Sequence, residues 1–315
     1  MEAWGLFVLG LVLLALGGDS IVKGASGLAQ RIGASPFVAG LLLIAFGTSL
    51  PELAVNARAF WVGSQELALG NAVGSNIVNL GLTLGLAALA APLMIRMRLL
   101  SPLLLVLGLA SALLMVFGLD GVIGRVEGLL LLAAFVVMLV LLLARARHES
   151  SQVRAGVEIY ASTRGALWMN LLRFVVAAAL LYFGARYVVA SATTIGASLH
   201  LSPLLTGLLP VAIGTALPEV AAAIAAARRG QGDMVAGHVI GSSVFNLLVI
   251  VGGMAALRPL PLPESFVRLE LPAAIAFVLV LYPMLRGDLR ISRGEGAILT
   301  LAFVAWVVLE IALLR

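Results

Sequence analysis

Two glutamates each follow a proline-containing break in an otherwise apolar segment. The run Ala45–Glu52 reads AFGTSLPE and the run Ala212–Glu219 reads AIGTALPE, and each lies near the middle of a stretch long enough to cross a bilayer. Proline removes a backbone donor and clashes with the preceding helical turn, so carbonyls before each proline lose their partners. Irregular backbone at membrane depth is tolerated where it lines a cavity, and freed carbonyls are good ligands for hard cations. The pattern therefore predicts a cation site.

Glu52 and Glu219 are the charged members of this pattern. An ionised carboxylate near the bilayer centre costs at least several kcal/mol unless a cation offsets it. Two bidentate carboxylates supply about four oxygens and the carbonyls of Thr48 and Thr215 about two more, which reaches the lower end of the roughly six to eight that Ca2+ takes. No sulfur or imidazole ligand is expected here, which argues against zinc or copper. The alternative is a structural role, with each carboxyl protonated and hydrogen bonded to a neighbouring helix.

Two polar pairs on other segments add further oxygens. Ser75 and Asn79 stand four residues apart, as do Ser242 and Asn246, so each pair presents two oxygens on one helix face. Glycines recur on the same side and allow another helix to approach closely. Simple helix packing explains either pair alone, but beside two breaks that each carry a glutamate we interpret them as parts of the site.

The composition places these segments in a membrane protein. Of 315 residues, 62% are hydrophobic and 11% are charged, and the mean hydropathy is +1.14, which is too apolar for a soluble chain of this size. The absence of cysteine excludes disulfides and thiolate metal sites, and three scattered histidines do not make a zinc cluster. Most basic residues lie in short connections between apolar stretches, which sets orientation and argues against a nucleic-acid partner.

Apolar stretches between charged residues predict an all-α integral membrane fold with ten transmembrane helices. We expect these helices at residues 4–30, 35–61, 67–92, 99–119, 123–144, 166–198, 202–227, 234–257, 270–285 and 296–314. The longest polar stretch predicts a linker at 145–164, between a first half at 1–144 and a second half at 165–315. Arginines concentrate on the side of the membrane that holds this linker, so we expect a cytoplasmic linker, both termini outside and a location in the cell membrane.

The two halves repeat each other. A shift of 167 positions places residues 35–82 on residues 202–249 without a gap, with roughly a third of the positions identical. The matches fall on Gly, Pro, Thr, Glu and Asn, which membrane helices use sparingly, so composition alone does not explain them. Because each half has an odd number of helices, the second half must cross the membrane in the opposite direction, as in many secondary transporters. We therefore expect two inverted five-helix repeats with broken helices 2 and 7.

The motif segments resemble those of the sodium/calcium exchanger branch of the cation/Ca2+ exchanger superfamily, in its prokaryotic form. They read GTSLPE and GNAVGSNIVN in the first half, and GTALPE and GHVIGSSVFN in the second. The resemblance implies a core of helices 2, 3, 7 and 8, against which the long helices 1 and 6 slide. It also implies a Ca2+ site at Glu52, Glu219 and the carbonyls of Thr48 and Thr215. The sodium sites that it implies draw on Ala45, Ser49, Glu52 and Ser75 in the first half, on Ala212, Thr215, Glu219 and Ser242 in the second, and on Asn79 and Asn246 at the middle.

Three positions differ from the family pattern or from the equivalent position in the other half. Ala216 stands where the family usually has serine, which removes one hydroxyl and bears on sodium affinity or stoichiometry. Asn246 occupies a position that is Asp in some members, which argues against potassium co-transport. His238 stands at the position of Asn71, and we interpret it as a helix-end substitution rather than a ligand.

These features predict a secondary active antiporter that exchanges Na+ for Ca2+ by alternating access. We expect no cofactor. The expected partners are small inorganic cations and membrane lipid, and no obligate protein partner is expected. Ca2+/H+ antiport is the alternative, because two carboxylates carry protons as well as metal. An ion channel also accepts acidic residues at the midplane, but inverted repeats with broken helices favour a carrier. An intramembrane enzyme is disfavoured because no base lies beside the Thr and Ser residues near the glutamates.

Two further charged features lie outside the motifs. Asp19 and Lys23 stand four residues apart on the first predicted helix, where they can pair. Glu310 lies near the outer end of the last helix, where we expect it to snorkel to the surface without a transport role.

Overall fold

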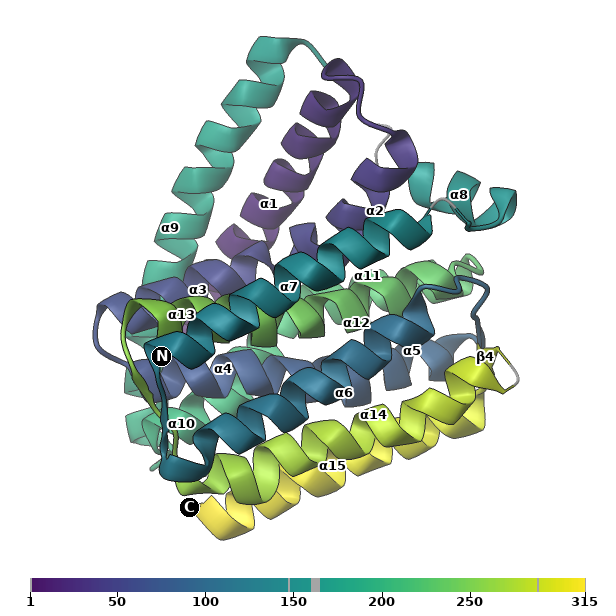
Figure 1. Ribbon diagram of the computed structural model, residues 1–315. Coiled ribbons are helices and arrows are strands. Elements are labelled where there is room, and N and C mark those ends of the chain that lie inside the picture. The colour runs from purple at the N-terminus through teal and green to yellow at the C-terminus, as the bar shows by residue number, and fades with distance from the viewer. Residues whose placement is uncertain (1, 147, 160–164, 288, 315) are drawn as a thin grey trace.

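The computed structural model describes residues 2–146, 148–159, 165–287 and 289–314, and these residues form a bundle of helices (Figure 1). In this described part of the chain, ten helical segments are long and apolar enough to cross a membrane. They cover Glu2–Arg31, Pro36–Trp61, Gln65–Ala90, Leu100–Asp120, Arg125–Ala146, Leu167–Ser198, Pro203–Arg228, Gly232–Leu257, Phe266–Arg286 and Arg293–Leu313. Each begins and ends within a few residues of its predicted bounds, so the predicted all-α membrane fold is confirmed.

Several of these spans are built from more than one regular element. The helices are α1 (Glu2–Arg31), α2 (Pro36–Phe46), α3 (Leu50–Trp61), α4 (Gln65–Ile77), α5 (Leu84–Ala90), α6 (Leu100–Phe117), α7 (Arg125–Ala146), α8 (Ser151–Glu158), α9 (Leu167–Ser198), α10 (Pro203–Thr206), α11 (Ala212–Arg228), α12 (Gly232–Phe245), α13 (Gly252–Leu257), α14 (Leu271–Arg286) and α15 (Arg293–Leu314). Spans 3 and 8 each contain a π-helical turn, at Val78–Thr83 and Asn246–Val251, in equivalent places of the two repeats.

Spans 2 and 7 both depart from regular α-helix, in different ways. A 3-10 turn at Gly47–Ser49 joins α2 to α3 in span 2, and Pro51 stands in the first turn of α3, where its missing amide hydrogen costs no hydrogen bond. Span 7 departs earlier, in a π-helical turn at Gly207–Val211 that contains Pro210. Because α11 then runs through Pro218, one carbonyl of the preceding turn has no amide donor.

Four short strands reflect the inverted relation between the halves. In the described residues β1 (Leu93–Met94) pairs with β4 (Arg290–Ile291), and β2 (Val122–Ile123) pairs with β3 (Leu260–Pro261). β1 and β3 are equivalent in the two repeats, as are β2 and β4, so each pair is the image of the other. The first pair follows spans 3 and 9, and the second follows spans 4 and 8, so the pairs lie at opposite ends of the bundle.

Spans 3 and 8 are the most buried helices and support the breaks of spans 2 and 7. A Cβ atom on Gly74 of α4 would lie 3.1 Å from Cβ of Ala212, and a Cβ on Gly241 of α12 would lie 2.6 Å from Cα of Ala45. These two contacts are images of each other under the repeat. Only glycine leaves room for such close approach, so both polar motifs are pressed against the opposite half of the protein.

The long helices α1 and α9 lie side by side and project from the rest of the bundle (Figure 1). A Cβ on Gly10 would lie 2.9 Å from the carbonyl oxygen of Gly184, so the two helices touch through their backbones. A Cβ on Gly18 would lie 3.0 Å from Cγ of Pro51, which places α1 against the break in span 2. The pair therefore contacts the motif core without being part of it.

Part of the predicted linker at 145–164 is folded against the first repeat. α8 packs on α2, where the carbonyl of Val157 touches the position that a Cβ of Gly40 would take. Glu149 accepts a hydrogen bond of 3.0 Å from the amide of Leu99, which ties the linker to the start of α6. Residues 147 and 160–164 lie outside the described residues, and the cytoplasmic placement of the linker stays a prediction.

Candidate ion-binding site

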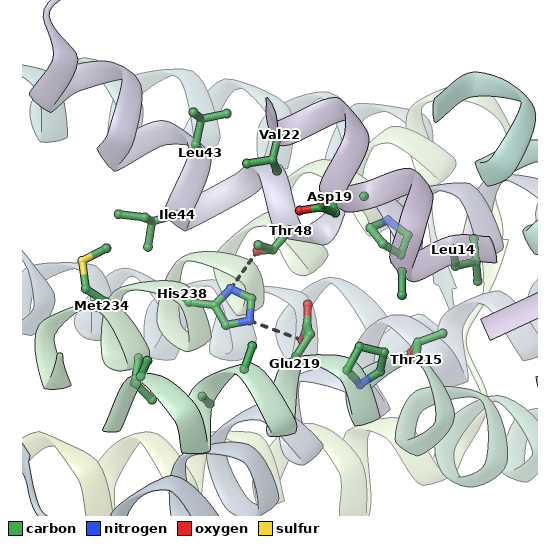
Figure 2. Close-up of a pocket in the computed structure, with 18 of the residues that line it drawn as sticks. Leu14, Asp19, Val22, Leu43, Ile44, Thr48, Thr215, Glu219, Met234 and His238 are labelled. Carbon is green, nitrogen blue, oxygen red and sulfur yellow. Dashed lines mark hydrogen bonds and ion pairs between the residues drawn. The ribbon is translucent and has the colours of Figure 1, made fainter. Parts of the chain in front are cut away.

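A cavity of about 390 Å³ lies between α1 and helices of spans 2, 7 and 8 (Figure 2). Most of its wall is apolar and comes from α1, α2, α11 and α12. Five side chains that carry polar atoms also line it: Asp19, Thr48, Thr215, Glu219 and His238. A cavity with an apolar wall and a few convergent polar groups is the usual form of a site for a small ligand.

Glu52 and Glu219 come from opposite repeats and are both withdrawn from solvent. Glu52 lies in the first turn of α3, is 1% exposed and has no hydrogen-bond partner for Oε2 in the described structure. Glu219 lies on α11 and lines the cavity, and neither of its buried carboxylate oxygens has a hydrogen-bond partner there. The two carboxylates are close enough for their charges to repel. A cation bound beside them would offset both charges.

The imidazole of His238 joins the two repeats at this cavity. Its Nδ1 lies 2.7 Å from Oγ1 of Thr48, and its Nε2 lies 3.5 Å from Oε2 of Glu219 (Figure 2). The expected helix-end position is therefore wrong, because His238 lies inside α12 and its ring lines the cavity. α12 begins at Gly232, so His238 stands in its second turn, on the face that meets spans 2 and 7.

A second polar contact joins spans 2, 3 and 8. Ser49 Oγ donates a hydrogen bond of 2.8 Å to Oγ of Ser242, and Asn79 Nδ2 donates one of 3.4 Å to the same oxygen. Oδ1 of Asn79 is buried and has no partner among the described residues. Three of the predicted site residues are thus brought together, and one acceptor oxygen remains free for a cation.

Asn76 is a buried group at the centre of the motifs that sequence reasoning missed. Its Oδ1 accepts a hydrogen bond of 3.0 Å from Nδ2 of Asn246, and its Nδ2 donates one of 3.1 Å to the carbonyl of Ser243. These bonds link span 3 to span 8 across the repeats. A signal was present, because Asn76 directly follows Ser75 inside the first motif, and an amide at such a position needs partners when it is buried.

The remaining predicted residues lie around this core. Ala45 and Ala212 are buried at the glycine contacts described above. The hydroxyl of Thr215 donates a hydrogen bond of 3.0 Å to the carbonyl of Val211, at the end of the π-helical turn in the same span. Ser75 is buried, but its hydroxyl has no partner in the described part of the chain.

The other intramembrane charges behave differently from one another. Lys23 Nζ lies 2.6 Å from Oδ2 of Asp19, so the expected pairing is confirmed, and Asp19 also lines the cavity. Glu310 is fully buried, so the expectation that it snorkels to the surface is wrong. It lies near Glu270, which is also fully buried, because this face of α15 is turned into the bundle.

Comparisons with known proteins place this arrangement in a family. A model of the sodium/calcium exchanger protein family matches residues 2–144 and 169–312. The chain belongs to the sodium/calcium exchanger family. It is 35% identical over 311 residues to the putative antiporter CaxA of Alkalimonas amylolytica, a match that covers 96% of each protein. It is 29% identical to the sodium/calcium exchanger MaX1 of Methanosarcina acetivorans, over 96% of this chain and 97% of that protein.

A solved structure shows the same fold. The sodium–calcium exchanger NCX_Mj, in crystals soaked with 2.5 mM Na+ and 10 mM Sr2+, superposes with a TM-score of 0.68 and 30% identity, over 100% of this chain and 99% of that one. The protein is therefore a multi-pass membrane antiporter of the prokaryotic exchanger type, which transports cations, Ca2+ among them.

Proposed function

We propose that this protein exchanges Na+ for Ca2+ by alternating access, with Glu52 and Glu219 as the charged ligands of one Ca2+. One observation carries the proposal: the two carboxylates come from inverted repeats and lie near each other with little exposure to solvent, Glu52 keeps an oxygen without a partner among the described residues, and Glu219 faces His238 Nε2 at 3.5 Å. Two negative charges match one divalent ion or more than one Na+. Either one Ca2+ or more than one Na+ offsets the charges of the two carboxylates, so the two kinds of ion compete for the same site.

Carbonyl oxygens complete the proposed Ca2+ site. Thr48 stands in the 3-10 turn of span 2, whereas Thr215 lies in the first turns of α11, next to Gly214, whose carbonyl loses its donor at Pro218; Thr48 and Thr215 both line the cavity. Irregular turns leave carbonyls without regular helical donors, and such carbonyls suit Ca2+. With two carboxylates they supply about six oxygens, the lower end of what Ca2+ takes.

The proposed Na+ sites use neighbouring oxygens of the same core. They are the backbone or side-chain oxygens of Ala45, Ser49, Glu52 and Ser75, of Ala212, Thr215, Glu219 and Ser242, and of Asn79 and Asn246 between them. The hydrogen bonds from Ser49 and Asn79 support this grouping, because both are made to the hydroxyl oxygen of Ser242.

Alternating access in this proposal is a movement of α1 and α9 against the core. α1 forms one wall of the cavity and touches Pro51 at the break of span 2. The backbone contact between Gly10 and Gly184 keeps the two long helices together as one unit. An empty pair of buried carboxylates is costly to carry across the membrane, so the loaded site crosses more readily than the empty one and exchange is coupled.

We also propose a location in the cell membrane with both termini outside. Arginines such as Arg96, Arg98 and Arg290 lie at the end of the bundle that holds the β1–β4 pair, and basic residues favour the cytoplasmic side. Accessibility of a cysteine introduced beside the C-terminus to an impermeant reagent in intact cells tests this orientation.

The test of the function is 45Ca2+ uptake into proteoliposomes that are loaded with Na+. We expect uptake to require an outward Na+ gradient and to stop when choline replaces internal Na+. Uptake that is unaffected by removal of Na+ would reject sodium coupling. A second arm imposes a pH gradient without Na+: uptake driven by that gradient would establish the Ca2+/H+ alternative instead.

A further inference from the structure

His238 is the one imidazole that reaches the cavity among the described residues, and each of its ring nitrogens faces a polar side chain. The side chain is 14% exposed and lies with one ring nitrogen toward each repeat (Figure 2). Nδ1 is 2.7 Å from the hydroxyl oxygen of Thr48. Nε2 is 3.5 Å from Oε2 of Glu219, which exceeds the usual range of about 2.7 to 3.2 Å for an N–H···O hydrogen bond.

The Thr48 contact fixes the ring. When Nδ1–H donates to this hydroxyl oxygen, the neutral ring carries its lone pair on Nε2, on the side of Glu219; in the other tautomer the Thr48 hydroxyl donates to Nδ1. Histidines that bind metals usually donate their other ring N–H to an oxygen acceptor in this way, which orients the ring and raises its basicity. Thr48 thus acts as the positioning residue of His238.

The separation of Nε2 from the carboxylate also suits one shared metal ion. Two ligands about 2.1 Å from a first-row metal ion lie roughly 3 to 3.5 Å from each other, depending on the angle between them. The observed 3.5 Å fits this spacing, and both buried oxygens of Glu219 lack hydrogen-bond partners in the described structure. No three His, Asp or Glu side chains of the described residues cluster as a metal site, so an ion bound here would take its other ligands from hydroxyl and backbone oxygens.

Nitrogen changes which cations the site prefers. Ca2+ takes oxygen ligands, whereas imidazole favours first-row transition metal ions. The equivalent position of the first repeat is Asn71, whose side chain offers an amide oxygen and no such nitrogen. We propose that His238 is a ligand of the transported ion and that it extends the substrates of this exchanger to first-row divalent metal ions such as Mn2+. The proposal rests on the transport function proposed above, because the metal ion would occupy the Glu219 side of the same cavity.

Mn2+ binding to the purified protein tests the ligand directly. Pulsed EPR of bound Mn2+ detects nitrogen nuclei in its coordination shell, and we expect coupling to one imidazole nitrogen in the wild type. The coupling disappears in His238→Asn, which copies the residue of the first repeat. His200→Asn is the matched control, because His200 is exposed and has a φ of 58°, a conformation that asparagine tolerates. Bound Mn2+ without nitrogen coupling in the wild type, or no Mn2+ binding at all, would overturn the proposal.

Transport provides a second readout that separates this inference from the exchange function. In proteoliposomes we expect His238→Asn to lower the ratio of 54Mn2+ to 45Ca2+ uptake about tenfold. Thr48→Val, which removes the hydroxyl that holds the ring, lowers the same ratio, and Thr48→Ser keeps it. A ratio that stays constant in His238→Asn while Ca2+ exchange continues would overturn the role of His238 and leave the exchange function in place. Loss of Na+-driven Ca2+ uptake in the wild type, with nitrogen-coordinated Mn2+ still bound, would instead reject the exchange function.

Discussion

Ser49 donates a hydrogen bond of 2.8 Å to Ser242, and the image of this bond in the other half of the protein is missing. The repeat places Ala216 at the position of Ser49 and Ser75 at the position of Ser242. Because alanine carries no hydroxyl, Ser75 keeps a buried oxygen without a partner among the described residues. The inverted repeats are therefore similar in backbone but unequal in their oxygen supply, and the two proposed sodium sites differ.

Ala216→Ser restores the missing hydroxyl. We expect the new side chain to contact Ser75, because the mirror pair does so at 2.8 Å, and to lower the Na+ concentration that half-saturates Ca2+ exchange several-fold. Ser49→Ala is the opposite change and should raise that concentration. Na+ dependence of 45Ca2+ uptake measures both. A shift of the Na+ dependence in the same direction by both substitutions would contradict a role of these hydroxyls as sodium ligands.

The contact between Gly10 and Gly184 carries a prediction about movement rather than binding. A Cβ on Gly10 would lie 2.8 Å from the Val188 side chain as well as 2.9 Å from the Gly184 carbonyl, so Gly10→Ala must push α1 away from α9. We expect a roughly tenfold lower turnover with Ca2+ still bound at equilibrium. Gly5→Ala is the matched control, because nothing lies within 4 Å of the added atom. Equal turnover in the two variants would show that the long helices do not move as a tightly packed unit.

Glu149, outside the membrane spans, carries a pH dependence of stability. Burial raises the pKa of its carboxyl above the ordinary value; the amides of Leu99 and Arg98 oppose this rise, and the charge of Asp233 adds to it. The folded state therefore holds the proton more tightly than the unfolded chain. The stability that this contributes is present below the unfolded pKa of about 4.3 and is lost as the pH rises through the folded pKa.

Glu149→Gln tests that sign. Glutamine keeps an acceptor for the Leu99 amide without the charge, so we expect the variant to melt above the wild type at neutral pH, and the difference to vanish near pH 4. Thermal unfolding in detergent at several pH values measures the effect. Glu158→Gln at the end of α8 serves as the control and should show no such convergence. A difference that grows as the pH falls would contradict the assignment.

Glu270 and Glu310 form a second buried pair of acids, away from the motifs. Both are buried and close enough for their charges to repel, and Trp306 is the polar side chain beside Glu310. We expect Glu310→Gln to stabilise the protein by about 1 to 2 kcal/mol at alkaline pH, because it removes a buried carboxylate that lies beside a second one. Glu264→Gln, on an exposed ion pair with Arg268, should change little. Thermal melting compares them, and a destabilised Glu310→Gln would mean that the carboxylate has a cationic partner.

The sequence was sufficient for the architecture because membrane spans and repeats leave strong patterns. Hydropathy located every span within a few residues. The shift of 167 positions predicted two inverted repeats, and the strand pairs β1–β4 and β2–β3 are related in that way. The break in span 2 was predicted from Pro51, and the irregular turn begins at Gly47, four residues before it. The irregular turn in span 7 lies before the motif, at Pro210, because α11 tolerates Pro218 in its interior.

Side-chain direction was harder to predict. Whether His238 ends a helix or enters the cavity depends on where α12 begins, which hydropathy fixes only to within a few residues. Glu310 lies within snorkelling distance of the end of its helix, and only the packing of α15 shows that it points inward. Both cases turn on the rotation of a helix about its axis, and apolar spans carry little periodic signal for that rotation.

The central claim is that Glu52 and Glu219 jointly hold one divalent ion, and equilibrium 45Ca2+ binding to the purified protein tests it most directly. We expect one Ca2+ per chain in the wild type, displaced by Na+, and affinity at least about 100-fold lower in both Glu52→Gln and Glu219→Gln. Size-exclusion profiles that match the wild type establish that the variants are folded. Unchanged Ca2+ affinity in both variants would contradict the account.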